Sequence, residues 1–218
     1  MRIKPKKSLG QNFLIDKNII KKIAEVYPIN NNEVIEIGPG TGNLTEFLIK
    51  KKPKKIFLIE KDRNLFLDLK KKFNKINIFN DDILKISLKN IINEKTIIFG
   101  NLPYNISSQI LIKFILNREN LPFKVLIFMF QKELADRIIA KPNTSSYGRL
   151  TILTNWKFTV KKLFEISPNS FFPKPKIKST LLIFKKKENS ILFKDPETLG
   201  KITKVFFNQR RKKIKNQF

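Results

Sequence analysis

Residues 99–108 read FGNLPYNISS, and the rest of the chain is organised around this stretch. The β-branched run Thr96–Ile98 precedes it and is typical of a buried strand, which we expect to stop near Gly100. Asn101–Tyr104 then predicts a rigid loop, because proline fixes the backbone there. A serine caps the helix expected from about Ser108 to Leu116. The stretch therefore predicts a strand, a loop and a helix in direct succession.

The loop Asn101, Leu102, Pro103, Tyr104 suits the chemistry of a nucleobase amine, whose lone pair is delocalised into the ring. An asparagine oxygen and a backbone carbonyl of the same loop can accept both amine hydrogens, which favours a tetrahedral nitrogen in the transition state. Tyr104 offers a flat face on which an extruded base can stack. We interpret these four residues as candidate catalytic residues. The alternative is an ordinary turn in which asparagine and proline are turn residues.

Length and composition limit the possible chemistry. The 218 residues suffice for one α/β domain with a small appendage. Histidine and cysteine are absent, which excludes disulfides, Cys/His metal sites, thiolate nucleophiles and a histidine base. No apolar run approaches the ~18 residues of a membrane span, and the start MRIKPKKS lacks the apolar part of a secretory signal. We expect a soluble, cytoplasmic protein that uses no metal.

The net charge of +27 points to a polyanionic partner, and nucleic acid is the first expectation. Most of the 45 basic residues are lysines, and isoleucine, asparagine and phenylalanine are also abundant. An A/T-rich coding sequence would produce the same bias without selection for binding. Charge alone therefore leaves both explanations open.

Four expected strands end in residues of chemical interest. Strands over 33–37, 56–60 and 76–79 and the strand before the Asn101 loop lead into Gly38, Glu60, Asp82 and Asn101. Gly38 begins GPGTG, whose glycines let the backbone approach a ligand at a helix N-terminus. An acid at the Glu60 position can accept bonds from ribose hydroxyls, and one at the Asp82 position can take an adenine amine. Each acid alone could be a solvated loop residue, but together they predict a pocket for a nucleoside-containing cofactor.

The remaining elements are placed by their hydrophobic patterns. We expect helices over about 17–27, 43–50, 132–140, 150–155 and 196–218, and strands over 125–130, 156–162 and 179–185. Residues 170–179 read SFFPKPKIKS, which is either a second aromatic wall with phosphate contacts at Lys174 and Lys176 or a surface loop whose phenylalanines pack inward. The tail is basic, and Arg210 and Arg211 are candidate RNA contacts unless it is simply a solvated, frayed terminus.

These motifs, in this order, resemble the KsgA-type ribosomal RNA adenine dimethyltransferases. The resemblance covers most of the chain and rests on the following stretches: KKSLGQNFL at 6–14, EIGPGTGNLT at 36–45, Glu60, Asp82, GNLPYNIS at 100–107, QKELADRIIAKP at 131–142, YGRL at 147–150, FFPKPKIKS at 171–179 and FFNQRRK at 206–212. It implies S-adenosylmethionine as methyl donor. It also implies two adjacent adenines in the 3′-terminal hairpin of small-subunit (16S) rRNA as substrate.

Carried over by position, the resemblance gives each candidate residue a role. It implies cofactor contacts for Asn12, Leu14, Gly38, Gly40, Glu60, Asp82 and Asn101. It implies that Asn101 and the backbone of Leu102 and Pro103 hold the target amine, and that Tyr104 and Phe171 stack on the flipped base. This sequence departs from the family at Asp81 and Lys178, and family members usually continue well past the FFNQRRK helix. These departures bear on the grip on substrate more than on the chemistry.

The sequence thus predicts a class I methyltransferase (Rossmann-like) α/β fold: a seven-stranded mixed sheet with helices on both faces. We expect residues 1–185 to form the methyltransferase domain, with an arm over 1–15, and 186–218 to form a short basic helical segment. The expected partner is rRNA in a partly assembled 30S particle, bound by a monomer. The alternatives are a large-subunit adenine methyltransferase of the macrolide-resistance type, a small-subunit assembly factor with secondary catalysis, and a small-molecule methyltransferase.

Overall fold

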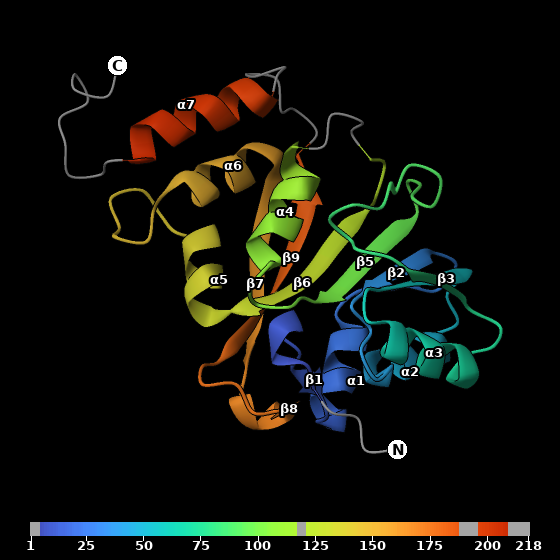
Figure 1. The fold of residues 1–218 in the computed structure, drawn as a ribbon. Helices are drawn as coiled ribbons and strands as arrows, with labels where there is room; N and C mark the ends of the chain where they lie inside the picture. The colour runs from blue at the N-terminus through green and yellow to red at the C-terminus, as the bar shows by residue number, and fades with distance from the viewer. Residues whose placement is uncertain (1–4, 117–120, 188–195, 209–218) are drawn as a thin grey trace.

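The computed structural model describes residues 5–116, 121–187 and 196–208 (Figure 1). Its centre is a seven-stranded sheet in the order β4-β3-β2-β5-β6-β9-β7. The first five strands in this order are parallel, and β9 and β7 are added antiparallel at one edge. The strands are β2 (Glu33–Ile37), β3 (Lys55–Glu60), β4 (Asn77–Asn80), β5 (Thr96–Asn101), β6 (Val125–Gln131), β7 (Phe158–Ile166) and β9 (Ser179–Lys186). The predicted mixed sheet is confirmed.

Helices cover both faces of the sheet because its central strands are apolar on both sides. In β6 the side chains of Leu126, Phe128 and Phe130 belong to one buried cluster, whereas Val125, Ile127 and Met129 belong to another. The first cluster packs against α4 (Ser107–Leu116), α5 (Lys132–Ile138), α6 (Arg149–Lys157) and α7 (Pro196–Asn208). The second packs against α1 (Lys17–Glu25) and α2 (Asn43–Lys50). Figure 1 shows α4 to α7 grouped around one half of the sheet and α1 to α3 (Arg63–Lys72) around the other.

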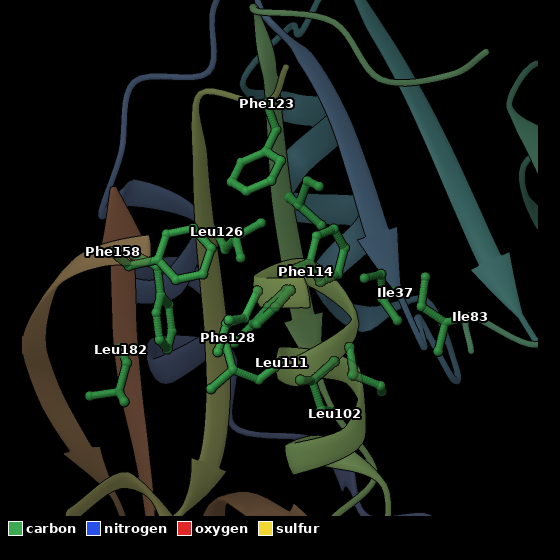
Figure 2. Close-up of a cluster of buried hydrophobic side chains, with 14 of the residues drawn as sticks. Ile37, Ile83, Leu102, Leu111, Phe114, Phe123, Leu126, Phe128, Phe158 and Leu182 are labelled. Atoms are coloured by element: carbon green, nitrogen blue, oxygen red, sulfur yellow. The ribbon is translucent and has the colours of Figure 1, made fainter. Parts of the chain in front are cut away.

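Aromatic rings fill the larger cluster, as Figure 2 shows. The Phe128 ring on β6 lies 5.7 Å from the ring of Phe114 on α4 and 6.2 Å from that of Phe184 on β9. Leu102, which directly follows β5, is 1% exposed and belongs to the same cluster. The loop after β5 is therefore anchored in the core by one of its own side chains.

A second, two-stranded sheet joins parts of the chain far apart in sequence. β1 (Phe13–Leu14) pairs antiparallel with β8 (Phe171–Phe172), with Leu14 opposite Phe171. Beside it the Ile15 N–H donates to the Ser170 carbonyl oxygen at 2.9 Å. Short 3-10 turns precede each strand, at Lys7–Leu9 and Pro168–Ser170. Neither strand was expected from the sequence, because two residues are too few for a hydrophobic pattern.

The structure corrects the sequence predictions at α6 and α3, describes only part of the predicted tail helix, and does not test the domain boundary. Trp156 was expected in a strand but lies in α6, which runs on to Lys157 before β7 begins. Helix α3, whose N-cap is Asp62, was not predicted from the sequence. The tail helix is described only as far as Asn208, and its Leu199 is buried in the larger cluster. The domain boundary after residue 185 stays a prediction. Among the described residues, every helix is too short or too polar to cross a bilayer.

Candidate active site

A pocket lies at the carboxyl ends of the parallel strands, where open α/β sheets bind their ligands. It is formed by the N-terminal arm, the β2–α2 turn, the end of β3, the loop after β4 and the loop after β5. All ten residues predicted for cofactor binding or catalysis line it: Asn12, Leu14, Gly38, Gly40, Glu60, Asp82, Asn101, Leu102, Pro103 and Tyr104. The structure therefore brings these residues together, while their individual roles stay predictions.

The β2–α2 turn exposes its backbone to the pocket at Gly38. Gly38 has a φ of 66°, and a Cβ there would meet only the Asn101 carbonyl oxygen, at 3.7 Å. The space in front of this residue is open, so a ligand can approach the backbone closely. At Gly40 the neighbour is different, because a Cβ would come within 2.9 Å of the Phe13 ring. Both glycines line the pocket, but Gly40 makes room for the arm, whereas Gly38 leaves its backbone open to a ligand.

Glu60 ends β3 with its carboxylate fixed by backbone donors. The Gly40 N–H donates to Oε2 at 3.1 Å and the Asp62 N–H donates to Oε1 at 2.8 Å. The residue is 6% exposed, and burial raises the pKa of its carboxyl even though these N–H groups oppose the shift. Each oxygen keeps a further lone pair, so the carboxylate can still accept bonds from two neighbouring hydroxyls.

Asp82 lies in the turn after β4 and is held by two contacts. Its Oδ1 accepts the Leu84 N–H at 2.9 Å, and its Oδ2 pairs with the Lys61 ammonium at 2.9 Å. Partial burial works against ionisation, but these two contacts keep the pKa of Asp82 below its usual value. The loop that follows is held by Lys113, whose ammonium donates to the Ile83 and Ile86 carbonyl oxygens at 2.6 Å each. Lys113 was not foreseen, since α4 gave no sign of facing this loop.

Asn101 is the last residue of β5, and its side-chain amide is held by the arm. Its Nδ2 donates to the Asn12 carbonyl oxygen at 3.0 Å. Because the nitrogen side of the amide is engaged, Oδ1 is left as an acceptor for another group. Tyr104, three residues on, is fixed by a 2.6 Å bond between its hydroxyl and Ser179 Oγ at the start of β9. The loop is therefore preorganised at both ends.

The N-terminal arm is tied across the pocket through Asp62. Lys6 Nζ donates to Asp62 Oδ1 and Gln11 Nε2 donates to Oδ2, both at 3.0 Å. Asn43 at the start of α2 donates to the Leu14 carbonyl oxygen at 2.7 Å. Asp62 is 4% exposed; burial opposes its ionisation, but the Lys6 and Gln11 hydrogen bonds keep its pKa below the usual value. Sequence reasoning missed Asp62, although its position two residues after Glu60 was a usable signal.

A second buried acid, Glu36, lies on β2 and lines the same pocket. It is 2% exposed and accepts a hydrogen bond from the Thr45 hydroxyl at 2.6 Å. Burial raises the pKa of Glu36 to about 7, partly offset by this bond and reinforced by the nearby Glu60 charge. An acid at a core position of an apolar strand was the signal that could have identified it.

Of the predicted substrate contacts, Tyr104 lines this pocket, and the others lie outside it or outside the described residues. Phe171 is 3% exposed and packs into the smaller core cluster, whereas its neighbour Phe172 is 55% exposed. The inward-packing alternative therefore describes Phe171 in this structure, and its stacking role stays a prediction without an exposed face to support it. Lys174 and Lys176 are exposed and do not line the pocket. Arg210 and Arg211 fall outside the described residues. In the described ranges, no cluster of three acids could hold a metal ion.

Comparison with known proteins identifies the family of this chain. The family model for ribosomal RNA adenine dimethylase matches residues 2–218. The chain belongs to that family. It is 56% identical to ribosomal RNA small subunit methyltransferase A of Pelagibacter ubique over 100% of this chain and 84% of that protein. It is 46% identical to the protein of the same name from Mesomycoplasma hyopneumoniae, over 97% of this chain and 80% of that protein.

Solved structures agree on the fold. A dimethyladenosine transferase from Plasmodium falciparum superposes with a TM-score of 0.80 and 32% identity, covering 94% of this chain and 74% of that chain. The 23S rRNA methyltransferase ErmE superposes with a TM-score of 0.72 at 24% identity, covering 94% of this chain and 82% of that one, and shows the fold alone. The Rossmann-like methyltransferase fold predicted from the sequence is confirmed.

The pocket fits the methyl donor used by this family. The Glu60 carboxylate has two oxygens that can accept adjacent ribose hydroxyls, and Asp82, beside the buried side chain of Ile83, has oxygens that can accept an adenine amine; these contacts stay predictions. The open backbone at Gly38 leaves room for the amino-acid end of the molecule. These residues follow β2, β3 and β4, which are neighbours in the sheet, and this placement fits a single nucleoside-containing ligand.

Proposed function

We propose that the protein transfers methyl groups from S-adenosylmethionine to N6 of two adjacent adenines in the 3′-terminal hairpin of small-subunit (16S) rRNA. When bound, the cofactor supplies an electrophilic methyl group. The observation that carries the proposal is the Asn101 amide, whose nitrogen is engaged by the Asn12 carbonyl oxygen while its oxygen is available in the pocket. Membership of the ribosomal RNA adenine dimethylase family supports the same reaction.

The role of the loop is to hold the amine in the geometry of the transition state. Asn101 Oδ1 and a backbone carbonyl of Leu102 or Pro103 accept the two amine hydrogens, so the nitrogen lone pair turns toward the methyl group. When the new carbon–nitrogen bond forms, the donor would lose its carbon–sulfur bond and leave as a neutral thioether, and one amine hydrogen leaves as a proton to solvent water. Tyr104, held by Ser179, supports the base by stacking. Catalysis in this account is positioning by neutral acceptors, and no side chain is required as a strong base.

The substrate is rRNA in a partly assembled small subunit rather than a free nucleoside. A flipped base contributes little binding affinity, whereas contacts to phosphates contribute much. The net charge of +27 agrees with binding through phosphates. The small-subunit target is favoured over a large-subunit one because the relatives at 56% and 46% identity are both named as small-subunit enzymes. We further propose that the protein acts as a monomer in the cytoplasm.

Mapping of methylated adenines tests this proposal. Ribosomal RNA from cells with and without the protein is compared by primer extension and mass spectrometry. We expect two adjacent dimethylated adenines in the small-subunit RNA only when the protein is present. Methylation of a large-subunit adenine instead would support the macrolide-resistance alternative and refute the target proposed here.

A further inference from the structure

A second cavity, of about 290 Å³, lies apart from the candidate active site and shares no lining residue with it. It is formed by the end of α5, the residues before α6, the first turn of α6, and α7. Figure 1 shows these three helices together, with α7 lying across α6. The reaction proposed above gives this cavity no role, so its own side chains have to indicate what it binds.

Hydrogen bonds between the helices hold the cavity in shape. The fully buried Thr151 hydroxyl accepts the Gly148 N–H at 3.1 Å and donates to the Arg137 carbonyl oxygen at 2.6 Å. This single side chain ties the end of α5 to the start of α6. On the opposite side Arg149 Nη2 donates to the Gly200 carbonyl oxygen at 3.2 Å, which ties α6 to α7. The cavity is therefore a fixed feature of the packed helices.

The cavity is lined by three cations, one from each helix. Arg137 comes from α5, Arg149 from α6 and Lys204 from α7, and no acidic residue is among the lining. Within the described residues, no carboxylate forms an ion pair with any of the three. Gly148 at the N-cap of α6 makes no side-chain cap hydrogen bond. All charged side chains of the lining are therefore cations, which favours an anionic ligand.

We propose that this cavity binds a phosphate group, and that in the working enzyme this is a backbone phosphate of the substrate RNA. Planar guanidinium groups match two phosphate oxygens at once, and the three cations of this cavity have no acidic residue among the lining to balance their charge. A phosphate is compact enough for a cavity of this size. The choice of RNA rests on the proposed function, because a free phosphate ion offers the same chemistry. The site would hold RNA at a distance from the reacting adenine without taking part in methyl transfer.

The test removes two charges inside the cavity and compares the result with the same loss outside it. The cavity variant is Arg137→Gln/Lys204→Gln, which leaves the structural Arg149 and Thr151 contacts intact. The control is Arg63→Gln/Lys201→Gln, at two exposed positions that do not line the cavity, the second of them also on α7. Both variants lose one arginine and one lysine, so their net charges are equal. Affinity for a structured small-subunit RNA is measured from about 50 to 200 mM salt, beside an S-adenosylmethionine titration.

We expect the cavity variant alone to lose about three- to tenfold in RNA affinity at low salt, with a salt slope lower by about one. Cofactor affinity should match the wild type in both variants. Equal RNA slopes in the two variants would refute RNA as the source of the phosphate. Thermal unfolding with added inorganic phosphate then tests whether the cavity binds phosphate at all. If phosphate stabilises the wild type and the control but not the cavity variant, the site binds a free anion. If phosphate does not stabilise the wild type, the phosphate site is refuted. Because binding is measured without turnover, failure of the proposed methylation would be seen separately.

Discussion

Asn101 is the residue on which the chemical account depends. Among the described residues, it is the only amide side chain that ends a central strand, lines the pocket and is hydrogen-bonded to the arm. The Asn12 carbonyl oxygen accepts its N–H at 3.0 Å, which fixes which end of the amide faces the amine. The sequence predicted the presence of this asparagine in the site. It could not predict the orienting contact, because the contact joins residues 89 positions apart.

Replacing Asn101 by alanine should separate catalysis from cofactor binding. We expect methyl transfer to fall about 10²–10³-fold, because one preorganised acceptor for the transition state is lost. Affinity for S-adenosylmethionine should stay within several-fold, because Glu60 and Asp82 remain. Single-turnover transfer and a cofactor titration measure the two effects, with the exposed Asn90→Ala variant as control. Near-normal turnover in Asn101→Ala would refute the role given to the loop.

Glu36 makes a prediction about pH. Its pKa of about 7 in the folded protein lies above the ordinary glutamate value of 4.5, so the native state binds an extra proton between these two pH values. Stability from this group is therefore present below pH 4.5 and is lost as the pH rises through about 7. Replacement by glutamine removes this dependence. We expect Glu36→Gln to gain stability relative to the wild type as the pH rises, by on the order of 2–3 kcal/mol at most.

Urea unfolding of both proteins at pH 5, 6, 7 and 8 measures this difference. The variant keeps a partner for Thr45, since the glutamine oxygen can still accept the hydroxyl, and this limits other effects of the substitution. A difference in unfolding free energy that does not change with pH would contradict the burial of an ionisable group at this position.

At the scale of elements, the arm forms one wall of the pocket. It reaches Asp62 through Lys6 and Gln11, Asn43 through Leu14, and Asn101 through Asn12. Sequence patterns located the strand ends, because parallel strands direct their carboxyl ends to one edge. They did not reveal the β1–β8 pairing that seats the arm, because two-residue strands carry no period. Long-range pairings of this kind depend on tertiary structure.

The hydrogen bonds from Lys6 and Gln11 to Asp62 should control how firmly the arm is held over the cofactor. The double variant Lys6→Ala/Gln11→Ala removes both side-chain donors and leaves Asp62 free to cap α3 through the Asn64 N–H. We expect about tenfold weaker cofactor binding, because one neutral and one partly exposed charged donor together contribute on the order of 1–2 kcal/mol. Hydrogen exchange over residues 6–14 should become faster.

A matched control is Lys51→Ala. This variant breaks the exposed ion pair in which Lys51 Nζ lies 2.8 Å from Glu25 Oε1, and neither residue lines the pocket. This variant should leave both cofactor affinity and exchange in the arm unchanged. If the double variant behaves like this control, the arm is held by other contacts, and the two hydrogen bonds to Asp62 do not contribute to cofactor binding.

At the scale of the whole molecule, aromatic packing in the larger cluster supports the strand ends that form the site. The Phe128 ring lies 5.7 Å from Phe114, 6.3 Å from Phe130 and 6.2 Å from Phe184. The apolar runs in the sequence predicted which strands are buried on both faces. They could not specify which rings meet, nor that Trp156 would lie in a helix, because such choices depend on how neighbouring elements pack.

Phe128→Ala should destabilise the protein by about 3–5 kcal/mol, since it opens a cavity among these rings. Leu67→Ala, at a position 45% exposed on α3, should cost less than about 1 kcal/mol. Urea unfolding followed by circular dichroism compares the two variants. Similar costs at the two positions would contradict the assignment of Phe128 to the centre of the core.

The most direct test of the central claim uses purified components. Small subunits lacking these methyl groups, large subunits and free adenosine are each incubated with the protein and S-adenosylmethionine carrying a labelled methyl group. The account predicts label in the small subunits alone, confined to two adjacent adenines as N6-dimethyladenine, and its loss with Asn101→Ala. Label in large subunits or in free adenosine, or undiminished label with Asn101→Ala, would contradict it.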